Sequence, residues 1–222
     1  MKRLLDILAA SISIFLLSPL MILISVLIKL LDPGPVIYKQ KRLGMHGKPF
    51  YIYKFRTMVV NAETVLKNDH DLYEKYKKNG FNLDLCNDPR ITKLGLFLRQ
   101  TKLDELPQFI NVLKGEMSLV GPRPVVEEET QYYGDYKNVF LSVKPGITGY
   151  WQLLGRSEVG YPERVDMELY YVNNQSIWLD IQIIIKTALS FLSLKSLAKQ
   201  SAVYIQSRKN TAGSGSIYYF FN

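Results

Sequence analysis

Cysteine and histidine are nearly absent from this chain of 222 residues. A single cysteine excludes an internal disulfide and is typical of a reducing compartment, where Cys86 is expected to pack as a small apolar side chain. The two histidines, His46 and His70, have no partners at metal-ligand spacing, so we expect both to be exposed. Helix-turn-helix, zinc and RNP patterns are also missing, which argues against nucleic acid as a partner.

Acidic residues are in the minority. The chain has 28 lysines and arginines against 20 aspartates and glutamates, a net charge of +8. This balance favours anionic partners, such as a membrane surface or phosphorylated small molecules. The length is long for one domain and short for two, so we expect one catalytic domain with an attached segment.

An apolar run extends from Leu4 to Leu31, with Asp6 and Lys29 as its charged residues. It is too long for a signal peptide, and no small-residue cleavage site follows it. A straight helix of this length would measure about 42 Å, which is enough to cross a hydrocarbon core of about 30 Å. A spanning helix is therefore one reading of the run.

Ser18 and Pro19 lie in the middle of this run and indicate a second geometry. Pro19 leaves the carbonyl of Phe15 without its usual donor and bends the helix, while the Ser18 hydroxyl can bond back to a carbonyl one turn earlier. Each limb would be about 20 Å long, too short to cross alone. Basic residues flank both ends, which is the cytoplasmic signature. The residues alone leave spanning and re-entry open.

A basic hairpin is expected next, after the helix-ending turn at 32–35. Residues 36–38 and 50–55 have the β-branched and aromatic content of strands, joined by a loop at 44–49. Some basic residues of this hairpin would face solvent or lipid head groups, and Lys54 or Arg56 could reach an active site. Residues 61–79 then predict a surface helix that ends at Gly80.

Two adjacent carboxylates, Asp104 and Glu105, lie at the centre of the chain. Because Pro107 fits only a first helical turn, we expect a helix from Leu103 to Gly115 with both carboxylates at its positive end, where the dipole keeps them ionised. An ionised Asp is a nucleophile, and a neighbouring Glu can hold a divalent cation. The alternative is ordinary helix capping.

Arginines surround these carboxylates. Arg90, Arg99 and Arg123 have the forked geometry that suits phosphate oxygens, and Arg123 lies in a stiff Gly-Pro-Arg-Pro turn. Phosphate chemistry is therefore the leading idea. Further on, the turn at 144–149 precedes an aromatic pair, and Arg156 and Arg164 are additional candidates for phosphate or uracil contacts.

The remaining elements are mostly helical. Residues 125–137 read as a polar helix start, 166–178 as an aromatic helix, and 179–194 as an apolar helix too short and too interrupted to span a bilayer. This last helix could lie in the membrane interface or pack in the core.

Several blocks in series carry a resemblance: Gln40-Lys-Arg-Leu-Gly44, Tyr53-Lys-Phe-Arg-Thr-Met58, Asp88-Pro-Arg-Ile-Thr92, Leu103-Asp-Glu-Leu-Pro-Gln108, Gly121-Pro-Arg-Pro124 and Lys144-Pro-Gly-Ile-Thr-Gly149. In order and without large gaps, from the first residue to about residue 187, the chain resembles the bacterial sugar transferases, or monotopic phosphoglycosyl transferases. The segment around Gly155-Arg156-Ser157 and Tyr161 is closer to members that transfer galactose or glucose. Lys102 and Gln175 depart from the common pattern.

The resemblance implies transfer of a sugar 1-phosphate from a UDP-sugar to a polyprenyl phosphate, with Mg²⁺. It also implies Asp104 as a covalent nucleophile, Glu105 as its partner and metal ligand, and a re-entrant helix broken at Ser18-Pro19. Independently of the resemblance, the residue pattern gives the candidate phosphate-binding set Arg123, Arg90, Arg99, Lys54, Arg56 and Arg156.

The resulting expectation is a helix-rich mixed α/β catalytic domain at residues 36–198, with a re-entrant membrane helix at 1–35, amphipathic interfacial helices, and a tail at 199–222. It would lie on the cytoplasmic face of a bacterial inner membrane, with membrane lipids as partners and a homodimer possible. The alternatives are a non-catalytic membrane-docked module that binds anionic lipid or scaffolds polysaccharide assembly, and an enzyme of direct transfer without a covalent intermediate.

Overall fold

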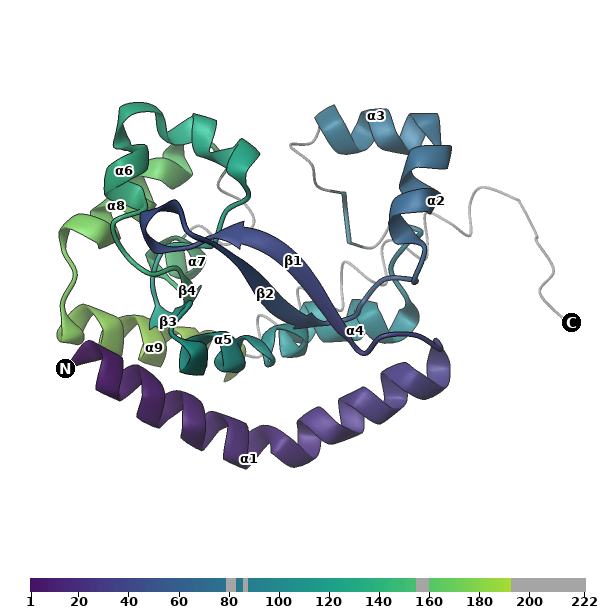
Figure 1. Cartoon of the computed structure of the whole chain (residues 1–222), viewed down its shortest axis with the longest axis horizontal. Helices are drawn as coiled ribbons and strands as arrows, with labels where there is room; N and C mark the ends of the chain where they lie inside the picture. Colours follow the sequence, from purple (N-terminus) through teal and green to yellow (C-terminus); the bar gives the residue numbers. More distant parts are fainter. Residues whose placement is uncertain (79–82, 86–87, 155–159, 193–222) are drawn as a thin grey trace, which may run out of the picture.

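The computed structural model describes residues 1–78, 83–85, 88–154 and 160–192, and over these residues the fold is helix-rich mixed α/β, as predicted (Figure 1). The predictions for Gly80, Cys86, Arg156 and the tail lie outside this part of the chain. The α-helices are α1 (Lys2–Leu31), α2 (Ala62–Asn68), α3 (His70–Lys78), α4 (Lys93–Thr101), α5 (Gln108–Lys114), α6 (Lys137–Phe140), α7 (Tyr150–Leu154), α8 (Glu163–Asn173) and α9 (Ile177–Leu192). The strands are β1 (Ile37–Leu43), β2 (Pro49–Phe55), β3 (Ser118–Val120) and β4 (Gly146–Thr148), with 3₁₀ segments η1 (Met45–Gly47), η2 (Leu103–Glu105) and η3 (Glu127–Tyr136).

Helix α1 runs unbroken through Pro19 and bends in its middle, with the convex side away from the rest of the molecule (Figure 1). The Ser18 hydroxyl donates a hydrogen bond of 2.8 Å to the carbonyl of Phe15, which is the carbonyl that Pro19 leaves without an N–H donor. The Phe15 side chain is 77% exposed. By length and composition, α1 is the one helix in the described segments that could cross a membrane, which indicates membrane association.

The N-terminal end of α1 is bonded to the globular part of the molecule. Lys2 forms an ion pair of 2.5 Å with Asp180 on α9, and the buried Asp6 carboxylate accepts hydrogen bonds from the Ser118 hydroxyl and the Leu119 N–H. The Asp6 carboxylate can lie inside an apolar run because residues of β3 supply the hydrogen-bond donors that it needs.

The C-terminal end of α1 is bonded to the same body. The Arg56 guanidinium, on the segment after β2, donates to the Asp32 carbonyl and lies 3.5 Å from the Asp32 carboxylate. Between the two ends, Ile24 and Ile28 of α1 pack with Phe55 and Leu98 in one apolar cluster. Both ends of the apolar helix are therefore fixed to one domain.

Strands β1 and β2 form the predicted antiparallel hairpin, with Ile37 opposite Phe55 and Leu43 opposite Pro49. Strand β1 is longer than the three residues expected. The amide of the buried Asn111 on α5 accepts from the Tyr53 N–H at 3.0 Å and donates to the Tyr51 carbonyl at 2.7 Å. This side chain fixes β2 against α5 and so sets the position of the residues next to Tyr53.

Some predicted helices are divided in the structure. The helix expected at 61–79 is two helices, because the Asp69 carboxylate accepts from the Leu72 N–H and caps a new helix. The expected aromatic helix at 166–178 is likewise α8 and the start of α9, where the Ser176 hydroxyl accepts from the Leu179 N–H.

Other boundaries also differ from the expectation. Residues 127–136 form a 3₁₀ segment, and part of the turn at 144–149 is strand β4. Helix α9 packs in the core through Ile183, while Trp178, Ile185 and Leu189 are exposed. Its location in a membrane interface stays a prediction. His46 and His70 are exposed, as predicted.

Candidate active site

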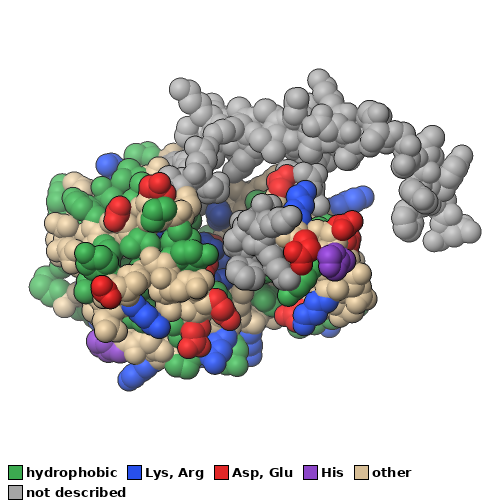
Figure 2. Space-filling model, turned by 90° about the horizontal axis from the view of Figure 1, so that it is seen from above, with side chains coloured by type: hydrophobic (Ala, Val, Ile, Leu, Met, Phe, Trp, Pro, Cys, Tyr) green, Lys and Arg blue, Asp and Glu red, His purple; other side chains and the backbone are tan. Residues whose placement is uncertain are grey.

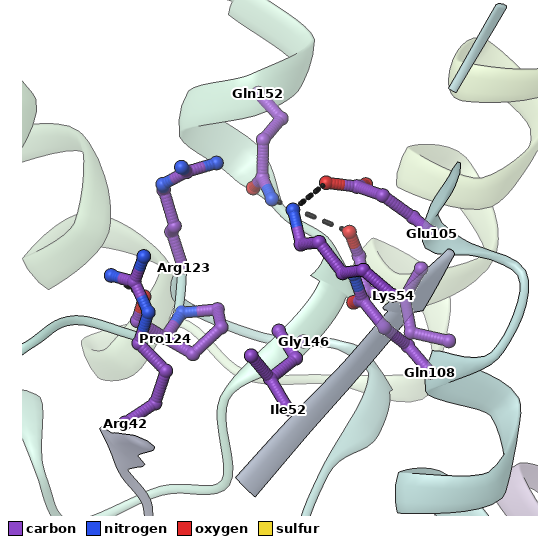
Figure 3. Close-up of a pocket in the computed structure, with 10 residues that line it drawn as sticks. Arg42, Ile52, Lys54, Glu105, Gln108, Arg123, Pro124, Gly146 and Gln152 are labelled. Atoms are coloured by element: carbon purple, nitrogen blue, oxygen red, sulfur yellow. Dashed lines mark hydrogen bonds and ion pairs between the residues drawn. The ribbon is translucent and has the colours of Figure 1, made fainter. Parts of the chain in front are cut away.

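A pocket opens between the hairpin, the segment 105–108 and the turn that follows β3 (Figure 3). Arg123 and Arg42 approach it from one side, and Lys54 and Glu105 approach it from the other. Seen from above, basic side chains line the recess in the middle of the molecule (Figure 2). The lining residues are Arg42, Ile52, Lys54, Glu105, Gln108, Arg123, Pro124, Gly146, Ile147 and Gln152.

Glu105 is held by Lys54. The Lys54 Nζ lies 2.7 Å from the Glu105 Oε1. Burial alone would raise the pKa of Glu105, but the charges of Lys54 and Lys102 and the hydrogen bond from Lys54 lower it to about 2. Glu105 is therefore ionised at neutral pH.

Asp104 is only 6% exposed, and its Oδ1 has no hydrogen-bond partner among the described residues. Burial raises its pKa, although Lys54, Lys102 and Arg99 act in the opposite direction. The expectation of an α-helix from Leu103 with this carboxylate in its first turn is wrong. No α-helix begins at Leu103: residues 103–105 form a 3₁₀ turn, and α5 begins only after Pro107.

The turn that carries Asp104 rests on the apolar helix. Its neighbours Leu103 and Leu106 pack against the cluster that contains Ile24 and Ile28 of α1. Asp104 does not line the pocket itself, but Glu105 does. The turn that carries Asp104 thus contacts the C-terminal limb of α1 through Leu103 and Leu106 and lines the pocket through Glu105.

Two backbone hydrogen bonds fix the turn that presents Arg123. The Gly121 N–H donates to the Thr148 carbonyl at 3.0 Å, and the Gly146 N–H donates to the Pro122 carbonyl at 2.8 Å. A side chain at Gly146 would overlap the backbone of Gly121, so this close pairing requires glycine. The stiff turn expected from the two prolines is confirmed, with β4 as the support that the sequence does not reveal.

Arg42 lines the pocket and was absent from the predicted site residues. Its Nη1 donates to the Pro124 carbonyl at 3.2 Å and lies 3.5 Å from the Glu129 carboxylate. Arg123 lines the same pocket, and burial together with the charge of Arg123 lowers the pKa of Arg42. Its position within the block Gln40–Gly44 was the available signal.

The structure does not bring every predicted arginine to the pocket. Arg90 donates two hydrogen bonds, of 2.8 and 2.7 Å, to the buried Asp88 carboxylate, and Arg56 is bound to Asp32. Both guanidiniums are directed to carboxylates outside the pocket. Arg99 donates to the Thr57 hydroxyl at 2.8 Å. Burial lowers the pKa of Arg99, and the negative charge of Asp104 acts in the opposite direction.

Among the described residues, no group of three or more His, Cys, Asp or Glu side chains is placed to hold a metal ion. Mg²⁺ is commonly bound by one or two carboxylates together with substrate phosphates. Glu105 and the unpartnered Oδ1 of Asp104 fit that arrangement only when phosphate oxygens complete it.

The chain matches the family model for bacterial sugar transferases over residues 1–194 and belongs to that family. It is 47% identical over 192 residues to undecaprenyl-phosphate galactose phosphotransferase of Salmonella typhimurium, covering 85% of this chain and 40% of the relative. It is 44% identical to exopolysaccharide production protein ExoY of Rhizobium meliloti, covering 84% and 83%. It is also 44% identical to UDP-glucose:undecaprenyl-phosphate glucose-1-phosphate transferase of Escherichia coli, covering 84% and 39%. The chain thus matches about two fifths of the length of the first and third relatives.

Proposed function

We propose that this chain is a membrane enzyme that transfers a hexose 1-phosphate from a UDP-sugar to a polyprenyl phosphate such as undecaprenyl phosphate. The observation that carries the proposal is the buried carboxylate of Asp104, whose Oδ1 has no partner among the described residues. It lies on a turn that lines the cationic pocket through Glu105 and packs against the apolar helix α1 through Leu103 and Leu106. A water-soluble and a lipid-soluble substrate must meet at such a boundary.

The first step forms a bond between an Asp104 oxygen and the phosphorus that carries the sugar. The bond from that phosphorus to the bridging oxygen breaks, and UMP leaves with the electron pair. In the second step an oxygen of the polyprenyl phosphate attacks the same phosphorus, and Asp104 leaves as a carboxylate. The product is a lipid diphosphate that carries the sugar.

The pocket residues would act by position and charge, which dominate phosphoryl transfer. Arg123 and Arg42 would bind the diphosphate oxygens from one side, and Lys54 would hold Glu105 ionised and in place. Mg²⁺, held by Glu105 and the diphosphate, would supply further neutralisation of the phosphate charge. Arg99 would offset the charge of Asp104 from behind.

The proposed location is the cytoplasmic face of a bacterial inner membrane, with α1 entering and leaving on that side. The bonds from Lys2 to Asp180 and from Arg56 to Asp32 support re-entry, because both ends of α1 are attached to one domain. The exposed apolar face of α9, which carries Trp178, would lie in the interface.

The names of the relatives support galactose or glucose as the sugar and exopolysaccharide synthesis as the pathway, of which this transfer would be the first membrane step.

The test uses the full chain in membranes with UDP-galactose or UDP-glucose, undecaprenyl phosphate and Mg²⁺. Asp104→Asn should abolish UMP release while the protein stays membrane-bound. Activity in neither protein with any UDP-sugar would favour the non-catalytic module. Without lipid acceptor, the wild type should retain a radiolabelled phosphosugar on the protein, and loss of that label in Asp104→Asn would separate covalent from direct transfer.

A further inference from the structure

A buried carboxylate lies behind the turn that presents Arg123, and the proposed reaction does not use it. Glu168 on α8 is 0% exposed, and its Oε1 accepts a hydrogen bond of 3.1 Å from the backbone N–H of Arg123. Glu168 is 45 residues from Arg123 in the sequence, so this hydrogen bond connects the pocket wall to a helix from a later part of the chain.

A second link runs through the Arg123 side chain. Arg164, one helical turn before Glu168, has its Nε 3.7 Å from the Glu168 Oε1. The Arg164 guanidinium lies 4.5 Å from the centre of the Trp151 ring, and the Arg123 guanidinium lies 5.9 Å from the same ring centre. Arg123 is thus connected to Glu168 at its backbone and, through Trp151 and Arg164, at its side chain.

The buried pair of Glu168 and Arg164 is not an arrangement that the stability of the fold alone would favour. Within the described residues, the Glu168 Oε2 and the Arg164 Nε and Nη2 have no hydrogen-bond partner, although they are buried. Buried ion pairs seldom stabilise a protein more than well-packed apolar residues of similar size. Buried polar groups with unused hydrogen-bonding capacity therefore call for another explanation.

The cations around the pocket suggest an explanation for this buried polar cluster. Arg42, Arg123 and Arg164 lie close enough that Arg123 and Arg164 both lower the pKa of Arg42. Two of these cations, Arg164 and Arg123, lower the pKa of Glu168, which burial raises to about 7. The Glu168 carboxyl therefore lies where cations of the pocket wall converge, and its Oε1 holds the Arg123 backbone by accepting from the N–H.

We propose that Glu168 is a positioning residue that, with Arg164 and Trp151, aims Arg123 at the diphosphate of the nucleotide sugar. The inference rests on the proposed function, since the diphosphate is its target. Glu168 should therefore affect turnover only through Arg123. A substitution at Glu168 should have little effect once the Arg123 side chain is removed.

The test is a double-mutant cycle on the full chain. Glu168→Met removes the acceptor at similar volume and should lower kcat/KM for UDP-galactose about ten- to a hundredfold, because small displacements of a catalytic group have effects of this order. Glu168→Gln keeps an acceptor for the Arg123 N–H and should stay within about threefold of the wild type. In an Arg123→Ala background, Glu168→Met should change kcat/KM by less than about threefold.

Losses that multiply in the double mutant, or equal losses in Glu168→Gln and Glu168→Met, would overturn the proposal. The matched control is Asp88→Asn, a second buried carboxylate paired with arginine but outside the pocket, whose effect should multiply with that of Arg123→Ala. If Glu168→Met does not fold, Glu168→Asp takes its place, because a shorter side chain withdraws the acceptor and retains the charge.

A binding measurement separates this inference from the proposed function. In a Trp178→Phe background, Trp151 is the remaining tryptophan, and its fluorescence can report titration with UDP. Weaker UDP binding in Glu168→Met, with little further loss when Glu168→Met is added to Arg123→Ala, supports the positioning role even if no protein releases UMP. Unchanged UDP binding in Glu168→Met would reject it, whatever the activity.

Discussion

The hydroxyl of Ser18 donates to the carbonyl of Phe15, which Pro19 deprives of its ordinary backbone donor. The adjacent pair in the sequence therefore both bends α1 and satisfies a polar group that lipid could not satisfy. This allows a bend within an apolar helix whose two ends are bonded to the same domain.

Pro19→Ala is expected to restore the missing hydrogen bond and straighten α1, which favours a spanning orientation. In a Cys86→Ser background with a cysteine added before Met1, a membrane-impermeant maleimide applied to intact spheroplasts should not label the parent protein and should label part of the Pro19→Ala population. A cysteine in place of the exposed Lys39 serves as the cytoplasmic control. Labelling of the parent N-terminus from outside would contradict re-entry.

Lys54→Met should raise the pKa of Glu105 from about 2 towards or above its usual value, since the main opposing charge is lost. Because a depressed carboxylate pKa keeps Glu105 ionised above it, the acid limb of the kcat/KM profile should move to higher pH in the variant. At neutral pH we expect a loss of about ten- to a thousandfold. Lys54→Arg, which retains the charge, should keep the acid limb near its wild-type position; identical profiles in all three proteins would contradict the assignment.

Arg42→Ala should raise the KM for UDP-galactose about tenfold or more, because charge-assisted hydrogen bonds to phosphate contribute about 1.5–3 kcal/mol each. The matched control is Lys41→Ala, one residue away on the same strand with an exposed side chain. Equal changes in KM for both variants would indicate a general effect of surface charge.

Asp88→Ala should destabilise the fold by about 3–5 kcal/mol, since it leaves the buried Arg90 guanidinium without its partner. Urea unfolding measures the loss. The KM of the folded variant should stay within about threefold of the wild type. A large rise in KM without loss of stability would return Arg90 to the phosphate-binding set.

The raised pKa of Glu168 predicts how the free energy of unfolding changes with pH. Its folded pKa of about 7 exceeds its ordinary value of 4.5, so between these values the folded state binds more protons than the unfolded state. Its contribution to stability should therefore decrease as the pH rises from about 5 to 7.5, by an amount on the order of 1–3 kcal/mol. Glu168→Gln should flatten this part of the urea-unfolding profile.

The groups that face Glu168 are Arg164 on its own helix, Arg123 on the pocket turn, and the tyrosines Tyr133 and Tyr161. Burial raises the pKa of both tyrosines, and Glu105, with a pKa of about 2, titrates below the range from pH 5 to 7.5. An unchanged slope in Glu168→Gln would contradict the assignment.

Local chemistry made several features of this protein predictable. Proline and serine gave the bend of α1, β-branched and aromatic residues gave the hairpin, and Gly115, at a positive φ of 83°, ends α5 as expected. The sequence predicted that Lys54 or Arg56 could reach the active site but left open which one pairs with Glu105, because Asn111 sets the position of β2 on α5 across the molecule. The same reason explains why Arg90, close to the carboxylates in sequence, is bound to Asp88 instead.

The sequence by itself determined the apolar helix, its bend, the adjacent carboxylates and the family, since each depends on residues that are neighbours in the chain. Only the tertiary structure decided that Lys54 pairs with Glu105, that Asp104 is buried on a turn packed against α1, and that the Glu168 carboxylate accepts from the Arg123 N–H. The partners in the first and last of these contacts are 51 and 45 residues apart, and no local pattern encodes the distance between two such side chains.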